Sequence, residues 1–198
     1  MTDRGRREQI QWAALRVFAR EGYQNTVVED VAAEAGVSKG TIYTYFDRKE
    51  ELLGAVAQGF MDELTGREEA ILESHRPPLE KIRAMLHEFV DLVSSREGFA
   101  TVMLDIWGIG MRDPDRFGID VAALYAEYRA LLQTLLREAQ ARGTVPADLS
   151  IVAPTALIGA IEGVLLQWLL DPDAVDFPGG ADDVIDLLYN GIRSEEAS

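Results

Sequence analysis

The 198-residue chain contains no cysteine and only two histidines, His75 and His87. The lack of cysteine excludes disulfide scaffolds, thiolate zinc sites, iron–sulfur clusters and cysteine nucleophiles. Neither histidine stands at metal-ligand spacing from a second histidine, and the sequence holds no phosphate-binding glycine loop and no nucleophile elbow. We therefore expect no metal, no cofactor and no enzymatic activity.

Basic residues are scarce. The chain has 19 lysines and arginines compared with 34 aspartates and glutamates, so its net charge is −15 and its pI is near 4.5. Taken as a whole, this charge argues against binding to nucleic acid. Its distribution is uneven, since residues 1–50 hold eight basic and eight acidic side chains and residues 51–198 carry the entire acidic excess. Only the neutral N-terminal quarter is therefore suited to approach DNA phosphates.

Apolar runs long enough to cross a membrane are limited to one segment, Leu149–Leu170. Glu162 lies near its middle, where a charge is costly, and Pro154 interrupts the helical pattern. Both flanks are acidic and lack basic anchors. Residues 1–8 are charged and no apolar stretch follows them, unlike a secretory signal. We expect a largely buried helix rather than a membrane span, and a cytoplasmic protein.

Apolar residues recur at intervals of three and four along the chain, and no segment alternates as a half-buried strand does. This pattern predicts an all-α fold of about nine helices. For the second helix we expect Thr26 as the N-cap and Glu29 as its capping-box partner. Asp113-Pro114 is expected to open a later helix. The expected helices cover about 4–21, 27–35, 39–46, 48–75, 79–96, 99–112, 113–142, 148–170 and 184–192.

Residues 28–46 have the pattern of a helix-turn-helix. Two short helices flank a tight turn, Gly36-Val37-Ser38, in which glycine allows a positive φ. Ala32 is small where the two helices must cross, and Val37 and Ile42 are apolar and can hold the second helix against the first. In such a motif the second helix enters the major groove of DNA. The pattern therefore indicates DNA binding by the neutral N-terminal quarter.

A series of residues between positions 7 and 53 matches a known pattern in order: Ile10, Ala14, Phe18, Gly22-Tyr23, Thr26, Val31-Ala32, Ala35-Gly36-Val37-Ser38, Gly40-Thr41-Ile42-Tyr43, Tyr45-Phe46 and Lys49-Glu50-Glu51-Leu52. Through these residues the stretch 7–53 strongly resembles the DNA-binding domain of TetR-family transcriptional regulators. The resemblance implies a ligand-responsive regulator, expected to be a repressor, that binds a near-palindromic double-stranded DNA operator as a homodimer and is released by a small apolar or amphipathic effector. It also implies a three-helix N-terminal helix-turn-helix domain at 1–48 and a C-terminal ligand-binding and dimerisation domain of about six helices at 49–198.

The same resemblance places the outward residues of the second helix of the motif against DNA. Lysine offers a mobile cation, glycine permits close backbone approach, and threonine and tyrosine offer hydroxyl and methyl groups to phosphates and base edges. Thr26 and Lys49 would lie near the DNA backbone, whereas an acid at Glu29 would repel phosphate. The predicted DNA-binding residues are Thr26, Lys39, Gly40, Thr41, Tyr43, Thr44, Tyr45 and Lys49.

Aromatic and methionine side chains are frequent on the middle helices of the acidic part. Any one of them can be an ordinary core residue, but as a set they suit an adaptable apolar pocket for the effector. The predicted pocket residues are Met85, Phe89, Met103, Trp107, Met111, Tyr125, Tyr128 and Trp168.

The most apolar helix carries Gly159 and Gly163, four residues apart, which permit close approach of another helix. Because the resemblance implies a four-helix interface built from the last two helices of each subunit, we expect these helices to form the homodimer. The predicted interface residues are Gly159, Gly163, Leu166, Leu187 and Leu188.

A second interpretation stays open at this point. The chain could be an acidic helical protein-binding module whose helix-turn-helix is degenerate and no longer binds DNA. Lys39 and Lys49 on an intact recognition face argue against it, and specific footprinting on DNA would exclude it.

Overall fold

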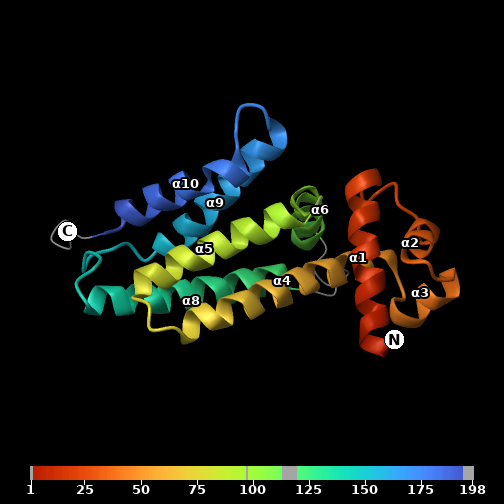
Figure 1. The fold of residues 1–198 in the computed structure, drawn as a ribbon, viewed down its shortest axis with the longest axis horizontal. Helices are drawn as coiled ribbons and strands as arrows, with labels where there is room; N and C mark the ends of the chain where they lie inside the picture. Colours follow the sequence, from red (N-terminus) through yellow and green to blue (C-terminus); the bar gives the residue numbers. More distant parts are fainter. Residues whose placement is uncertain (1, 97, 113–119, 194–198) are drawn as a thin grey trace. The chain divides into compact units, whose positions relative to one another are not determined.

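The computed structural model describes residues 2–96, 98–112 and 120–193. All regular secondary structure in these residues is helical (Figure 1), so the all-α prediction is confirmed. The helices are α1 (Asp3–Glu21), α2 (Val28–Ala35), α3 (Lys39–Tyr45), α4 (Lys49–Glu73), α5 (Pro78–Ser95), α6 (Phe99–Arg112), α8 (Val121–Ala141), α9 (Ala153–Leu170) and α10 (Phe177–Gly191).

The chain folds into two compact units. The first consists of residues 1–63 and 93–121, and the second of residues 64–92 and 122–198. Helices α4 and α5 therefore each contribute residues to both units. The division at residue 48, which separates DNA binding from effector binding by function, stays a prediction.

The core of the first unit joins α1 to α6 and to the first part of α4. Phe18 of α1 is fully buried, and the rings of Phe60 and Phe99 stack with their centroids 3.9 Å apart. Gly98, at a φ of 76°, leads the chain into α6 where any Cβ would collide with the methyl group of Ala19. These contacts hold α1 and the first part of α4 against α6.

The core of the second unit is formed by α5, α8, α9 and α10. Trp168 and Phe177 stack with ring centroids 5.8 Å apart, which joins the end of α9 to the start of α10. The side chains that this core buries almost completely include Met85, Leu132, Leu136, Leu165, Phe177 and Ile185. Burying such side chains contributes roughly 1.5–3 kcal/mol each before the entropy cost of ordering them.

Two predicted helix starts need comment. Helix α9 begins at Ala153, later than predicted, because residues 146–152 form turns and irregular backbone. Pro154 therefore lies in the first turn, where its missing N–H removes no helical hydrogen bond, and it does not interrupt the helix. Helix α8 begins at Val121, and the predicted start at Asp113-Pro114 lies outside the described residues.

Among the described helices, α9 alone is long and apolar enough to cross a membrane by length and composition. Only 28% of it is buried in the folded chain, so the prediction of a largely buried helix is wrong for the chain by itself. Leu157, Ile161 and Leu165 pack in the core of the second unit, whereas Leu166 and Leu170 are exposed. Helix α9 thus packs on its own unit with one face and presents a second apolar face outward.

Candidate nucleic-acid interface and effector unit

The turn between α2 and α3 has the geometry that the sequence predicts. Gly36 lies in the left-handed region, with φ 65° and ψ 35°. The N–H of Gly36 donates to the carbonyl of Ala33 at 3.1 Å, and the N–H of Val37 donates to that of Ala32 at 2.9 Å, which closes the C-terminus of α2. The hydroxyl of Ser38 accepts the N–H of Thr41 at 3.1 Å and caps α3. Local hydrogen bonds therefore set the angle between the two helices.

Helix α3 is fastened to the unit on one side only. Ile42 is 1% exposed and Phe46, directly after the helix, is 2% exposed. The hydroxyl of Tyr45 donates to Oδ1 of Asp3 at 2.7 Å, which links the end of α3 to the start of α1. This hydrogen bond is the largest cause that raises the pKa of Tyr45. The opposite side of α3 faces solvent with Lys39, Gly40, Tyr43 and Thr44.

Small side chains on the outward side of α3 leave its backbone accessible. A Cβ at Gly40 would meet only Oγ of Ser38, at 3.7 Å, so nothing in the fold requires glycine there. The hydroxyl of Thr44 donates to the carbonyl of Gly40 at 3.1 Å, and the hydroxyls of Thr41 and Ser38 lie 2.9 Å apart. The helix itself therefore does not require glycine at position 40, and a close approach of DNA to Gly40 stays a prediction.

Lys39 and Tyr43 form one cluster with an acidic neighbour. Nζ of Lys39 donates to Oε1 of Glu29 on α2 at 2.6 Å and lies 5.7 Å from the ring centroid of Tyr43. This bond is the largest cause that lowers the pKa of Glu29 and raises the pKa of Lys39. Tyr43 is 45% exposed. The cluster offers an aromatic face, a cation and a carboxylate on the same exposed surface.

Thr26 and Lys49 are engaged within the protein. Thr26 is 1% exposed and its hydroxyl donates to the carbonyl of Gly22 at 3.0 Å. Nζ of Lys49 donates to the carbonyls of Tyr23 at 2.8 Å and Thr26 at 3.0 Å, and it lies 4.4 Å from the ring centroid of Tyr23. Both side chains thereby hold the loop between α1 and α2 in the free chain, and a DNA contact by either stays a prediction.

The predicted cap of α2 is wrong by one residue. Val27, not Thr26, is the N-cap, and its N–H donates to Oδ2 of Asp30 at 3.1 Å. The hydroxyl of Thr26 donates to the carbonyl of Gly22 in the preceding loop, and α2 starts one residue later in the chain than predicted. Glu29 is therefore not the capping-box partner, and its carboxylate pairs with Lys39.

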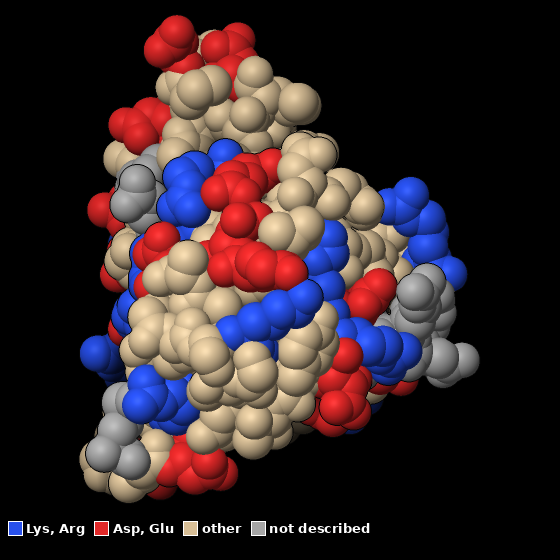
Figure 2. Space-filling view, turned by 90° about the vertical axis from the view of Figure 1, so that its right-hand side faces the viewer, with Lys and Arg blue, Asp and Glu red and all other residues tan. Residues whose placement is uncertain are grey.

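Charges of both signs alternate over the first unit. Figure 2 shows the side on which α2 and α3 lie in Figure 1, where basic and acidic side chains are interspersed. Arg16 pairs with Glu34 at 2.7 Å, and Arg4 pairs with Glu8 at 3.0 Å. The guanidinium of Arg7 instead lies 5.0 Å from the ring centroid of Phe46. Positions 1–50 are neutral because they hold eight basic and eight acidic residues, and several of these form ion pairs with one another.

The structure divides the predicted effector-pocket residues between the two units. Met103, Trp107 and Met111 lie on α6 in the first unit, where Met111 is 79% exposed. The other five lie in the second unit, on α5, α8 and α9, and are Met85, Phe89, Tyr125, Tyr128 and Trp168. Met85 is fully buried in the core and Trp168 stacks on Phe177.

Two tyrosine–carboxyl hydrogen bonds lie inside the second unit. The hydroxyl of Tyr128 donates to Oε1 of Glu68 on α4 at 3.0 Å, and the hydroxyl of Tyr125 donates to Glu162 on α9. Tyr125 and Tyr128 are three residues apart and share one side of α8. Burial raises the pKa of Glu162 above its ordinary value, and the bond from Tyr125 opposes this effect. The unit therefore holds two carboxyl groups that are poorly solvated.

Glu68 is the functional candidate that sequence reasoning missed. It is 4% exposed, and burial raises its pKa to about 7 against the hydrogen bond from Tyr128. The same burial raises the pKa of Tyr128 well above its ordinary range. A signal was present, because Glu68 stands between Leu64 and Ile71 on the apolar stripe of α4, where a carboxylate is out of place.

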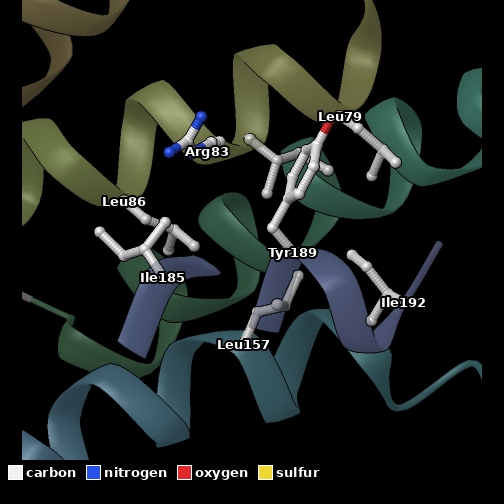
Figure 3. Close-up of a pocket in the computed structure, with 8 residues that line it drawn as sticks. Leu79, Arg83, Leu86, Leu157, Ile185, Tyr189 and Ile192 are labelled. Carbon is white, nitrogen blue, oxygen red and sulfur yellow. The ribbon is translucent and has the colours of Figure 1, made fainter. Parts of the chain in front are cut away.

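A small apolar depression lies elsewhere in the second unit, between α5, α9 and α10 (Figure 3). At its edge, Nη2 of Arg83 pairs with Asp186 at 2.7 Å, and the hydroxyl of Tyr189 donates to Glu80 at 2.6 Å. None of the predicted pocket residues lines it. The lining residues are Leu79, Ile82, Arg83, Leu86, Leu157, Ile185, Tyr189 and Ile192.

The predicted dimer residues lie on the outward sides of α9 and α10. Positions beyond the Cα atoms of Gly159 and Gly163 are open, with no atom within 4 Å of an added Cβ. Leu166 is 41% exposed and Leu187 is 74% exposed, whereas Leu188 is half-buried. Large apolar side chains left in solvent on two neighbouring helices are typical of a surface that another molecule covers.

Metal ligands do not gather in the structure as described. Across residues 2–96, 98–112 and 120–193, no three histidine, aspartate or glutamate side chains converge as a metal ion would need.

Comparison with known proteins gives this arrangement a family. The description "Bacterial regulatory proteins, tetR family" matches residues 11–56, which contain the helix-turn-helix, and "BetI-type transcriptional repressor, C-terminal" matches residues 78–188, more than half of the chain. The chain belongs to the TetR family of bacterial regulatory proteins.

Individual relatives can be aligned with this chain over most of its length. The chain is 25% identical over 189 residues to the fatty acid metabolism regulator protein of Bacillus subtilis, covering 94% of this chain and 95% of the relative. It is 28% identical over 163 residues to the transcriptional repressor KstR2 of Mycolicibacterium smegmatis, covering 82% and 78%. The solved structure of FadR from Bacillus subtilis in complex with stearoyl-CoA matches with a TM-score of 0.76 and 25% identity, covering 93% and 98%.

The protein is accordingly a ligand-responsive, DNA-binding transcriptional regulator. Regulators of this family bind operator DNA as dimers and respond to small-molecule effectors. The relatives are regulators rather than enzymes.

Proposed function

We propose that this regulator is a repressor that reads its operator with the exposed side of α3, and that Lys39, Gly40, Tyr43 and Thr44 make the contacts. The observation that carries the proposal is the one-sided attachment of α3, with Ile42 buried and Tyr43 45% exposed. A homodimer would place two such helices in successive major grooves, roughly 34–36 Å apart, which requires a near-palindromic operator. Because its target is the chromosome, the protein acts in the cytoplasm.

Dimerisation is proposed to occur through α9 and α10. Leu166, Leu170 and Leu187 supply exposed apolar surface, and Gly159 and Gly163 allow a partner helix to approach closely. The long apolar helix is then covered on both faces, by its own unit and by the partner subunit. This arrangement would account for its composition without a membrane.

The effector is proposed to be a small apolar or amphipathic molecule that binds in the second unit. The two tyrosine–carboxyl pairs, Tyr128 with Glu68 and Tyr125 with Glu162, are the polar groups that such a ligand would meet among apolar side chains. Since FadR from Bacillus subtilis was solved in complex with stearoyl-CoA, a long-chain acyl-CoA is the first probe. A ligand releases DNA only if it binds the DNA-free state more tightly than the DNA-bound state.

The test is fluorescence anisotropy with DNA from upstream of the protein's own gene, compared with scrambled DNA. We expect the upstream DNA to bind about 10³-fold more tightly or better, with affinity that falls as salt rises. Tyr43→Ala should weaken operator binding by roughly 1–3 kcal/mol. Leu104→Ala is the matched control, because Leu104 is 39% exposed on α6 of the same unit.

Equal and weak binding to both DNA molecules, followed by no enrichment in a genomic selection, would overturn the proposal. That result would favour the acidic protein-binding module instead. Operator affinity that is unchanged in Tyr43→Ala would remove α3 as the reading surface.

A further inference from the structure

Glu29 is an acidic side chain on the surface that the proposed function assigns to DNA. A carboxylate there repels phosphate, and its expected use as a capping residue is taken by Asp30. Its side chain is 56% exposed and that of Lys39 is 49% exposed, so neither is needed in the core. Glu29 is one of two acids in the first turn of α2, and a hydrogen bond from its own backbone N–H helps to lower its pKa. A role beyond this helix terminus comes from its bond to Lys39 or from its effect on DNA.

The bond fixes one of the three donors of a flexible ammonium group. Nζ of Lys39 is held 2.6 Å from Oε1 of Glu29 and 5.7 Å from the centroid of the Tyr43 ring. The two partners come from α2 and α3, whose relative angle is set by the Gly36 turn. Lys39 is thus held near the side of α3 instead of extending freely toward solvent, and its other two N–H donors stay available.

Resting on the proposed reading of DNA by α3, we propose that Glu29 is a positioning residue that sets operator specificity. The carboxylate of Glu29 weakens the attraction between Lys39 and DNA phosphates of any sequence. It also holds the ammonium group where it can donate a hydrogen bond to a base acceptor in the major groove. Non-specific binding depends on phosphate contacts, whereas specific binding depends on correctly placed donors. The pair therefore lowers affinity for random DNA more than affinity for the operator.

The test compares Glu29→Gln with the wild-type chain on operator and on scrambled DNA, across a salt series. We expect the variant to bind scrambled DNA about 3- to 10-fold more tightly near 0.1 M salt, with a salt dependence steeper by about one phosphate contact. Operator affinity should stay within about twofold, so the ratio of the two affinities falls by about threefold or more. A merely structural role would leave the salt slope unchanged.

Glu34→Gln is the matched control. It removes the same charge from the same helix, but Glu34 pairs with Arg16 and Arg20 of α1 rather than with α3. In a Lys39→Gln background, Glu29→Gln should no longer change the ratio of operator to scrambled affinity. Circular dichroism and thermal melting of each variant confirm that the fold is retained.

The outcomes separate the two proposals. A wild-type chain without operator preference overturns the proposed function and this inference together. A clear preference that Glu29→Gln leaves unchanged overturns only the inference, as does an equal effect of Glu34→Gln or an effect of Glu29→Gln that persists without Lys39.

Discussion

Replacing Glu68 with glutamine should remove a pH dependence of stability that the buried carboxyl creates. The ordinary pKa of this group is 4.5, and burial raises it to about 7 in the folded chain. Between these values the folded state keeps a proton that the unfolded state has lost. The stabilisation is therefore complete below pH 4.5 and is lost as the pH rises through about 7.

The size of this effect on the free energy of unfolding follows from the interval between the two pKa values of Glu68. Each pH unit in which the two states differ by one proton changes the free energy of unfolding by about 1.4 kcal/mol. From pH 4.5 to about 7 the total is about 3 kcal/mol. The sequence pI near 4.5 makes acidic solutions unfavourable for solubility, so the useful range begins about one pH unit above the pI. Between that pH and about pH 8, the free energy of unfolding of the wild-type protein should still change by about 2 kcal/mol relative to the variant.

The assay is urea denaturation of wild-type protein and Glu68→Gln at fixed protein concentration, since dimerisation makes apparent stability depend on concentration. Glutamine does not titrate and can still accept the hydroxyl proton of Tyr128. Wild type should lose about 2 kcal/mol relative to the variant as the pH rises over the useful range. Glu69→Gln, an exposed neighbour on α4, is the control. A difference that stays constant with pH, or an equal trend in the control, would refute the reasoning.

Three further predictions follow from single contacts. Gly40→Ala should stabilise the fold by up to about 1 kcal/mol in thermal melting, since the added methyl has room, yet weaken operator binding; undiminished binding would show that DNA does not approach Gly40. Lys49→Met leaves three carbonyls without their donor, and urea denaturation should show a loss of about 2 kcal/mol; no loss would contradict the anchoring role. Leu187→Glu, at a position 74% exposed, should yield a helical monomer in sedimentation; a persistent dimer would remove α10 from the interface.

The sequence alone determined the features that depend on neighbouring residues. The turn at Gly36, the cap at Ser38 and the buried Ile42 were all predictable, because φ, capping and helical periodicity involve only a few adjacent positions. The division into a neutral N-terminal quarter and an acidic remainder needed only counting. The resemblance to a known family covered the same local stretch.

Tertiary structure decided which side chains meet across helices. Lys49 donates to the carbonyls of Tyr23 and Thr26, 26 and 23 positions earlier in the chain, and nothing near Lys49 in the sequence indicates these partners. The same holds for Glu29, whose partner Lys39 lies on the next helix. Glu68 shows the point most clearly, because burial among distant helices raises its pKa, and the hydrogen bond that opposes the rise comes from Tyr128, 60 positions later in the chain. Local sequence specifies a helix and its polarity, but only the packing of distant helices specifies which polar group is buried and what it contacts.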